Sequence, residues 1–255
     1  MQRTIARLNK QEPTTIVVIG DSCSVDTPWT YGRKNWVQYL AEALWHTYGD
    51  GFITLLNSSR CGAAYATELP RLEASVLRFK PDLVVSAIGK LNTDDGPEAL
   101  ATDRNAARQV VARIQAASGE ILFVTINPVV WGFWEPRPEG APSGEAFLNH
   151  HGRSEASARA LVKFAAELGL PVVDVYAAWK KHTIPFKSQT SHPQGLRMRM
   201  APDTVHPGPT GHLAIFRQIA PYFEVPPYFA WEEVPFEYPA KGASARKRGR
   251  RPRRA

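Results

Sequence analysis

The stretch Thr15-Ile16-Val17-Val18-Ile19-Gly20-Asp21-Ser22-Cys23-Ser24 decides the fold of this chain. Its first five residues are all β-branched, and a continuous run of this kind is typical of a strand buried on both faces of a parallel sheet. Gly20 and Asp21 then favour a tight turn at the end of the strand. Ser22 is therefore expected at the carboxyl edge of the sheet, where open α/β folds bind their ligands.

Predicted strands and helices alternate along the rest of the chain. Apolar runs predict further strands over 52–56, 83–88, 121–126 and 172–175. Apolar residues at helical spacing predict helices over 33–48, 68–79, 97–117, 154–168 and 209–222. We expect irregular stretches over 129–153 and 180–202. This alternation predicts a three-layer α/β sandwich built on a parallel sheet.

The composition is that of a soluble globular protein. The chain has 255 residues, of which 44% are hydrophobic and 22% charged. No stretch approaches the roughly 18 apolar residues of a membrane-spanning helix. Residues 1–13 are polar and lack the apolar core of a secretory signal. We therefore expect a cytoplasmic protein without a membrane span.

The net charge of +7 is concentrated at the C-terminus. The range from Lys241 to Arg254 holds eight basic residues and no acidic one, so the rest of the chain is near neutral. This composition predicts a basic, disordered tail over 241–255. Two interpretations of the tail stay open. It is either a solvated terminus without a dedicated partner, or an anchor whose arginines bind nucleic acid or another polyanion weakly.

Polar residues stand at the exits of the first three predicted strands. They are Ser22 after the first strand, Asn57 and Gly62 after the second, and Gly89 and Asn92 after the third. The carboxyl ends of parallel strands meet at one edge of the sheet, so these residues are expected to lie near one another.

A further polar pair stands just before the last predicted helix. Asp203 and His206 are three residues apart, and a turn at that spacing can bring both side chains to the same site. His206 would then take the proton of the Ser22 hydroxyl, while Asp203 would orient the imidazole and stabilise its charged form. The expected catalytic residues are Ser22, Asp203 and His206.

These motifs resemble those of the SGNH or GDSL hydrolase superfamily. Gly20-Asp21-Ser22 matches the nucleophile block of that superfamily. The range from Asn57 to Gly62 matches the second block, N-x-G-x-S-G, with Ser59 and Cys61 in place of the usual Gly and Ser. The range from Asp203 to His206 matches the last block.

The resemblance spans about Thr15 to Tyr222. It implies a three-layer α/β/α sandwich with a parallel, flavodoxin-like sheet and a serine esterase or lipase-like activity, without a metal or an organic cofactor. It also implies an oxyanion hole formed by the N–H groups of Ser22 and Gly62 and by the side chain of the third-block Asn. The hydrolase-like domain is then expected over 14–223, between a polar segment over 1–13 and a Pro- and aromatic-rich extension over 224–240.

The third block departs from the superfamily pattern. The superfamily has G-x-N-D, whereas the range from Gly89 to Asp94 has one extra residue before Asn92 and no Asp directly after it. Either the loop bulges so that Asn92 still reaches the oxyanion, or the hole is weaker than usual. Loss of one such donor typically costs roughly 10²–10³ in rate.

The sequence therefore predicts a serine esterase that hydrolyses small carboxylic esters through an acyl-enzyme on Ser22. O-acetyl groups on carbohydrate are one expected substrate. Two alternatives stay open. One is an acyltransferase that uses the same triad with a different acceptor, and the other is a non-catalytic binding module whose site has decayed.

Two further groups of residues have open roles. Trp131, Phe133 and Trp134 either line a substrate pocket or pack the loop that carries them onto the body of the protein. Cys23 and Cys61 both adjoin proposed catalytic positions. They are either two small buried residues or a disulfide or redox switch over the site.

Overall fold

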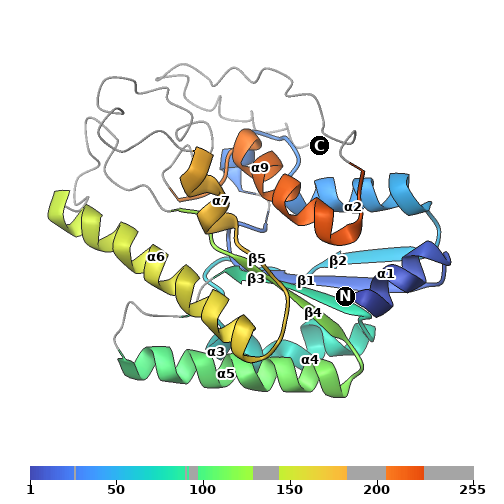
Figure 1. The fold of residues 1–255 in the computed structure, drawn as a ribbon, viewed down its shortest axis with the longest axis horizontal. Helices are drawn as coiled ribbons and strands as arrows, with labels where there is room; N and C mark the ends of the chain where they lie inside the picture. The colour runs from blue at the N-terminus through green and yellow to red at the C-terminus, as the bar shows by residue number, and fades with distance from the viewer. Residues whose placement is uncertain (26, 90, 92–96, 129–143, 183–204, 227–255) are drawn as a thin grey trace, which may run out of the picture.

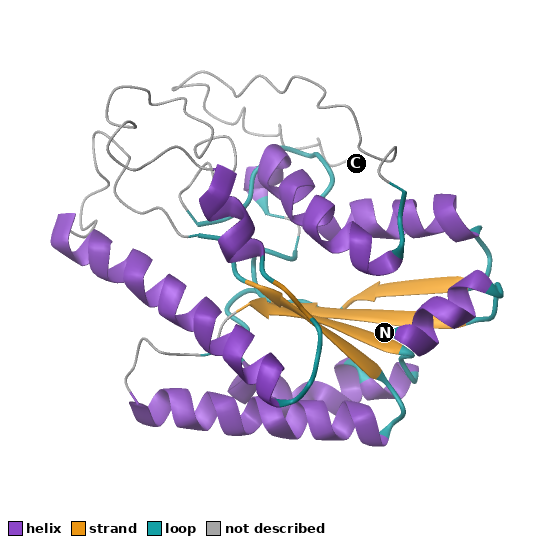
Figure 2. Ribbon diagram, in the orientation of Figure 1, coloured by secondary structure: helices purple, strands orange, loops and turns teal. Residues whose placement is uncertain are grey.

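A five-stranded sheet runs through the middle of the molecule, with helices on both sides (Figures 1 and 2). The computed structural model describes residues 1–25, 27–89, 91, 97–128, 144–182 and 205–226. The strand order is β2-β1-β3-β4-β5, and every neighbouring pair is parallel. This arrangement confirms the predicted α/β/α sandwich with a parallel sheet.

Side chains of the strands point alternately to the two faces of the sheet. The strands are β1 (Thr14–Gly20), β2 (Ile53–Asn57), β3 (Leu83–Gly89), β4 (Glu120–Thr125) and β5 (Val172–Val173). In β1, Ile16 and Val18 belong to one hydrophobic cluster, whereas Val17 and Ile19 belong to the other. Because both faces are covered, the strand reads as a continuous apolar run and not as an alternating one.

Each cluster is completed by its own set of helices. One face packs against α1 (Gln2–Asn9), α2 (Trp36–Tyr48), α7 (Val175–His182) and α9 (Pro209–Ile219). The other face packs against α3 (Tyr65–Glu68), α4 (Leu72–Ser75), α5 (Pro97–Ala116) and α6 (Gly144–Glu167). Among the helices that the structure describes, none is long and apolar enough to cross a membrane.

The strand order places a switch point beside β1. From β1 the chain first adds β2 on one side, and then adds β3, β4 and β5 in turn on the other side. The connections that leave the carboxyl ends of β1 and β3 therefore diverge. In open α/β sheets this is where ligands bind, and it is where Ser22 follows β1.

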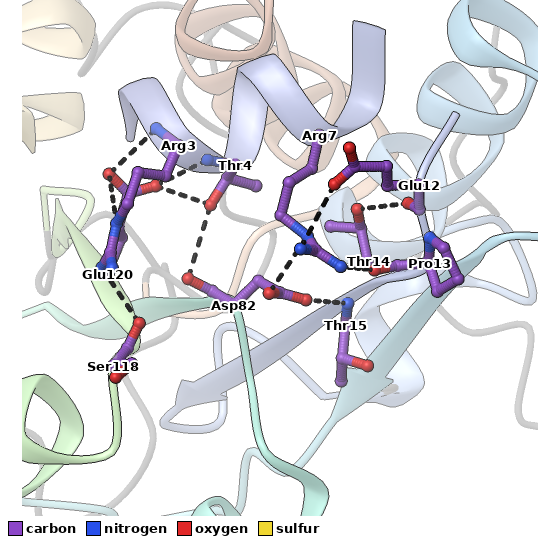
Figure 3. A network of polar contacts seen from close by, with 10 residues as sticks. All are labelled: Arg3, Thr4, Arg7, Glu12, Pro13, Thr14, Thr15, Asp82, Ser118 and Glu120. Carbon is purple, nitrogen blue, oxygen red and sulfur yellow. Dashed lines mark hydrogen bonds and ion pairs between the residues drawn. The ribbon is translucent and has the colours of Figure 1, made fainter. Parts of the chain in front are cut away.

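Residues 1–13, for which the sequence predicted no regular element, contain α1, and this helix lies across the amino ends of the strands (Figure 3). Arg7 Nε lies 3.3 Å from a carboxylate oxygen of Asp82, and the other oxygen of Asp82 accepts a bond of 2.8 Å from the backbone N–H of Thr15. The hydroxyl of Thr4 donates to Glu120 over 2.7 Å. These polar contacts tie α1 to the beginnings of β1, β3 and β4.

Several helices differ from the sequence-based expectation. The helix predicted over 68–79 is a series of short pieces, in which the 3₁₀ turns Leu69–Arg71 and Leu77–Phe79 flank α4. Pro70 interrupts the helical pattern there because it has no backbone N–H. The irregular insert predicted over 129–153 is wrong for residues 144–153, which belong to α6. Helix α7 was not predicted, and the closing helix ends as the 3₁₀ turn Ala220–Phe223.

Candidate active site

The turn after β1 explains why Gly, Asp and Ser follow one another. A Cβ atom on Gly20 would lie 2.4 Å from Oγ and 2.8 Å from Cβ of Ser24, so a larger residue does not fit. The Asp21 carboxylate accepts a bond of 2.8 Å from the N–H of Cys23, and the Asp21 carbonyl accepts one of 3.0 Å from the N–H of Ser24. Asp21 thus stabilises the tight turn that carries Ser22.

Ser22 and His206 meet at this edge of the sheet although 184 residues separate them. His206 Nε2 lies 2.9 Å from Ser22 Oγ, and both residues are half-buried. His206 comes just before α9, which begins at Pro209 with Gly208 as its N-cap. When the imidazole carries its proton on Nδ1, Nε2 accepts a hydrogen bond from the hydroxyl. This pair is therefore arranged to move the hydroxyl proton to the imidazole.

The loop after β2 is bonded to the end of β1 and to the turn that follows it. The N–H groups of Ser58 and Arg60 donate to the carbonyls of Val18 and Gly20 over 2.8 and 3.0 Å. The Asn57 side chain donates to the carbonyl of Ser24 over 2.7 Å. The second-block loop is thus hydrogen-bonded to β1 as far as Gly20, the last residue of that strand.

Gly62 lies two residues beyond the last of these bonds. It has φ +70° and is exposed to solvent. This φ lies in the left-handed region, which glycine adopts without strain. The role of the Gly62 N–H as an oxyanion donor stays a prediction.

The other predicted site residues lie outside the described part of the chain. They are Asp203, Asn92 and the aromatic residues Trp131, Phe133 and Trp134. Of the third block, the structure describes Gly89 and Leu91, and Leu91 is 1% exposed. The proposed roles of Asp203 and Asn92 therefore remain predictions.

A comparison with protein families identifies the chain. The model of the GDSL-like lipase/acylhydrolase family matches residues 18–214, a range that includes the Ser22 turn, the second-block loop and His206. The chain belongs to this family. As a member of the GDSL-like family it is a carboxylic ester hydrolase. No curated protein matches the chain in sequence.

Several solved structures share the fold of this chain. A catalytic mutant of Axe2, an acetylxylan esterase from Geobacillus stearothermophilus, has a TM-score of 0.61 at 19% identity, over 84% of this chain and 96% of that one. A GDSL-like lipase from Parabacteroides merdae also has a TM-score of 0.61, at 16% identity, over 84% and 97% of the chains. TesA has a TM-score of 0.55 at 20% identity, over 82% and 97%. At these identities the likeness establishes the fold.

Asn127 is a residue near the site that the sequence analysis did not select. It lies just beyond β4, is 2% exposed, and donates from Nδ2 to the carbonyl of Val205 over 3.0 Å. Val205 immediately precedes His206, so Asn127 holds the segment that carries the imidazole. The rule that polar residues gather at strand exits applies to Asn127 as it does to Ser22, and it would have found this residue.

His212, the other histidine close to the site, is fully buried in α9. Its Nδ1 accepts a bond of 3.3 Å from the N–H of Trp36, the first residue of α2. Burial, with a smaller effect from the charge of nearby His206, lowers the pKa of His212 to about 3. His212 therefore stays neutral at physiological pH and joins α9 to α2.

A cavity of about 290 Å³ lies between α2 and the loops of the first and second GDSL-family blocks. Its apolar lining residues are Val25, Val37, Ala41 and Leu55, and its polar ones are Asn35, Gln38, Asn57 and Ser59. The hydroxyl oxygen of Ser59 is buried and has no hydrogen-bond partner among the described residues. Among the residues that the structure describes, the lining side chains are all uncharged.

Neither cysteine forms a disulfide. Cys23 is buried in the turn after β1, whereas Cys61 is exposed in the second-block loop. The structure therefore contains no disulfide between them, and of the two only Cys23 is the small buried residue that the sequence suggested. In the part of the chain that the structure describes, no three His, Cys, Asp or Glu side chains gather in a way that could hold a metal ion.

Proposed function

We propose that this GDSL-like hydrolase cleaves small, uncharged carboxylic esters, O-acetyl groups on carbohydrate among them, through an acyl-enzyme on Ser22. The observation that carries the proposal is the 2.9 Å contact between Ser22 Oγ and His206 Nε2 at the carboxyl edge of the sheet. A serine hydroxyl is a weak nucleophile, and an imidazole within hydrogen-bond distance activates it.

The reaction would proceed in two halves. Ser22 Oγ attacks the ester carbonyl while His206 Nε2 takes the hydroxyl proton, and a tetrahedral oxyanion forms. His206 then gives this proton to the leaving alcohol, and the acyl group stays on Ser22 as an ester. In the second half, water attacks that ester with His206 as the base, and the carboxylic acid leaves.

Four groups are proposed to assist these steps, three as oxyanion donors and one as the partner of His206. The backbone N–H groups of Ser22 and Gly62 would donate to the oxyanion, and the Asn92 side chain would be the third donor. Asp203 would hold the imidazole of His206 in the correct orientation and stabilise its charged form. Support for Gly62 comes from the loop bonds to Val18 and Gly20, which bring the second block to the end of β1.

The substrate class is inferred from two observations. In the described part of the chain, the cavity beside the Ser22 and Gly62 loops is lined by amide, hydroxyl and aliphatic groups, which suits a neutral substrate. Axe2, which shares the fold, is an acetylxylan esterase and so acts on a carbohydrate ester. We therefore propose a neutral acetylated carbohydrate as the natural kind of substrate.

Replacement of the nucleophile is the direct test. Ser22→Ala should lower kcat on para-nitrophenyl acetate by roughly 10⁴–10⁶, and labelling by a fluorophosphonate should vanish. Ser24→Ala is the matched control, because Ser24 belongs to the same turn but its hydroxyl has no proposed role. Retention of more than a tenth of wild-type turnover by Ser22→Ala would sink the assignment.

A panel of para-nitrophenyl esters of increasing acyl length, together with acetylated xylo-oligosaccharides, tests the substrate class. Ala41→Phe narrows the cavity and should lower kcat/KM for the oligosaccharide ester more than for para-nitrophenyl acetate. Equal effects on both substrates would argue against a role of the cavity in binding.

Two measurements with activated esters distinguish an ester hydrolase from an acyltransferase and from a non-catalytic binding module. Transfer of the acyl group to added alcohols in preference to water would identify an acyltransferase. Absence of a burst of product from an activated ester would favour a binding module.

A further inference from the structure

A buried carboxylate with two arginine partners lies beneath the second-block loop. Glu68, the last residue of α3, has a side chain that is 2% exposed. Its Oε1 lies 2.6 Å from Arg60 Nε, and its Oε2 lies 2.6 Å from Arg71 Nη1. Burial of a carboxylate lowers the stability of the fold unless both of its oxygens are paired. The side chain of Glu68 therefore holds the guanidinium groups of Arg60 and Arg71 in place.

Arg60 is held at both ends. Its backbone N–H donates to the carbonyl of Gly20 over 3.0 Å, and Gly20 is the residue two before Ser22. Its side chain donates to Glu68 and also, from Nη2, to the carbonyl of Thr67 over 3.2 Å. Arg60 therefore links the end of β1, two residues before Ser22, to Thr67 and Glu68 of α3.

Arg71 holds the same loop at an earlier point. Its Nη1 donates to the carbonyl of Ser58 over 3.4 Å in addition to its contact with Glu68. The Ser58 hydroxyl donates to the carbonyl of Ser75, the last residue of α4, over 2.6 Å. The loop is thus attached to α3 and α4 at residues 58 and 60.

Gly62 depends on this attachment because it has little packing of its own. A Cβ atom added to Gly62 would meet no atom of the described residues within 4 Å, and Cys61 before it is exposed. The next fixed residue is Ala63, which is 2% exposed and whose N–H donates to the carbonyl of Arg60 over 3.3 Å. Residues 61 and 62 therefore span a short turn whose two ends are Arg60 and Ala63.

We propose that Glu68 is a positioning residue that, through Arg60, sets the place of the Gly62 N–H in the oxyanion hole. This inference rests on the proposed function, since it needs an oxyanion next to Gly62. An oxyanion donor acts only when it lies within about 2.7–3.1 Å of the oxygen in the transition state. Without the contact between Arg60 and Glu68, the loop would keep the Gly62 N–H less well at this distance from the oxygen.

Glu68→Gln is the first test, because it keeps the size of the side chain and removes the charge that pairs both arginines. Loss of a whole donor costs roughly 10²–10³ in kcat, so a displaced donor should cost less, about tenfold. KM should change less than about twofold, because the contact forms mainly in the transition state. Phenylboronic acid, which forms a tetrahedral anion on a reactive serine, should bind about tenfold more weakly.

Glu167→Gln is the matched control. The Glu167 carboxylate also contacts two arginines, Arg104 and Arg108, but it joins α5 to α6 and lies outside the second-block loop. This variant should keep the wild-type kcat and boronate affinity. A loss of kcat in Glu167→Gln equal to that in Glu68→Gln would overturn the inference, because loss of any such ion pair would then have the same effect.

Arg60→Lys is a second variant that tests the link even if Glu68→Gln does not fold. Arg60 is 42% exposed, and Lys keeps the charge but cannot reach both Glu68 and the Thr67 carbonyl as a guanidinium does. It should lower kcat about as much as Glu68→Gln, and the double variant should be no worse than either single one. Unchanged kcat in Arg60→Lys, or losses that multiply in the double variant, would refute the inference. The proposed function would stand in that case if Ser22→Ala is inactive, so the two failures are distinguishable.

Discussion

Asn127 and Val205 are joined by a hydrogen bond of 3.0 Å from the Asn127 side-chain amide to the Val205 carbonyl oxygen. The thiol sulfur of Cys23 lies 4.0 Å from the same oxygen. Since Cys23 follows Ser22 and Val205 precedes His206, this carbonyl contacts a neighbour of Ser22 and itself belongs to the neighbour of His206. Asn127, just beyond β4, therefore helps to set the distance between the Ser22 hydroxyl and the His206 imidazole.

Asn127→Leu should impair catalysis by loosening His206. The Val205 carbonyl loses a partner, which costs roughly 1–3 kcal/mol of stability, and kcat/KM should fall by about tenfold or more because a small displacement of a catalytic group is costly. Thr125→Val is the control, because Thr125 lies two residues before Asn127 and its hydroxyl accepts a bond of 3.0 Å from the N–H of Tyr176. It should reduce stability but leave kcat unchanged, and equal losses of kcat in both variants would contradict the prediction.

Gly20→Ala should distort the turn that carries Ser22. The new methyl group would lie 2.8 Å from the Ser24 Cβ, and Ser24 is 1% exposed and has little room to move. Overpacking of this kind typically costs roughly 1–3 kcal/mol, and kcat should fall with it. Adding Ser24→Gly removes the atoms in conflict and should restore part of the thermal stability and activity. A double variant no better than Gly20→Ala would show that the clash is not the cause.

His212 should make the protein less stable in mild acid. Its pKa is about 3 in the folded state against the ordinary value of 6.5, so below pH 6.5 the unfolded chain binds a proton that the folded protein does not. The ionisation of His212 therefore does not affect the free energy of unfolding above pH 6.5. It lowers that free energy by about 1.4 kcal/mol per pH unit as the pH drops from 6.5 towards 3.

Urea denaturation at several pH values, compared between wild type and His212→Asn, measures this contribution. Asn offers an oxygen near the place of Nδ1 and can still accept from the Trp36 N–H, but it does not titrate. The variant should lose less stability than wild type between pH 6.5 and 4. Parallel curves for the two proteins would show that His212 does not control the acid limb.

Removal of residues 241–255 should leave the enzyme active. The removed segment carries eight basic residues and lies outside the part of the chain that the structure describes. A protein ending at Ala240 should keep its kcat/KM on a neutral ester, while any retention of the full chain on heparin at low salt should disappear. Loss of activity on truncation would mean that the tail belongs to the catalytic domain.

The parts of the fold that depend on strong apolar runs could be predicted from the sequence. The run into Gly20 and the runs of β3 and β4 are buried on both faces, so their pattern is distinct. Helix α1 was not predicted because few apolar residues hold it. It is attached instead by polar contacts such as those of Thr4 and Arg7 with Glu120 and Asp82, and these contacts leave no periodic pattern in the sequence.

The candidate site also combines features that the sequence pattern predicts with contacts that it does not. The contact between Ser22 and His206 could be expected, because strand exits and the family blocks both point to these residues. The contribution of Glu68 could not, since its partners Arg60 and Arg71 are close only after the loop and α3 have folded together. Charged residues at such spacing are otherwise typical of a solvated surface.

The position of α1 offers a surface through which this enzyme can be attached to a support. The helix covers the amino ends of the strands, whereas Ser22 follows the carboxyl end of β1, and seven residues of strand separate the two edges by roughly 20 Å. Gln2 and Asn9 are exposed on α1. A support or carrier coupled to these positions would attach at the edge of the sheet away from Ser22, so immobilised enzyme should keep its kcat/KM on para-nitrophenyl acetate.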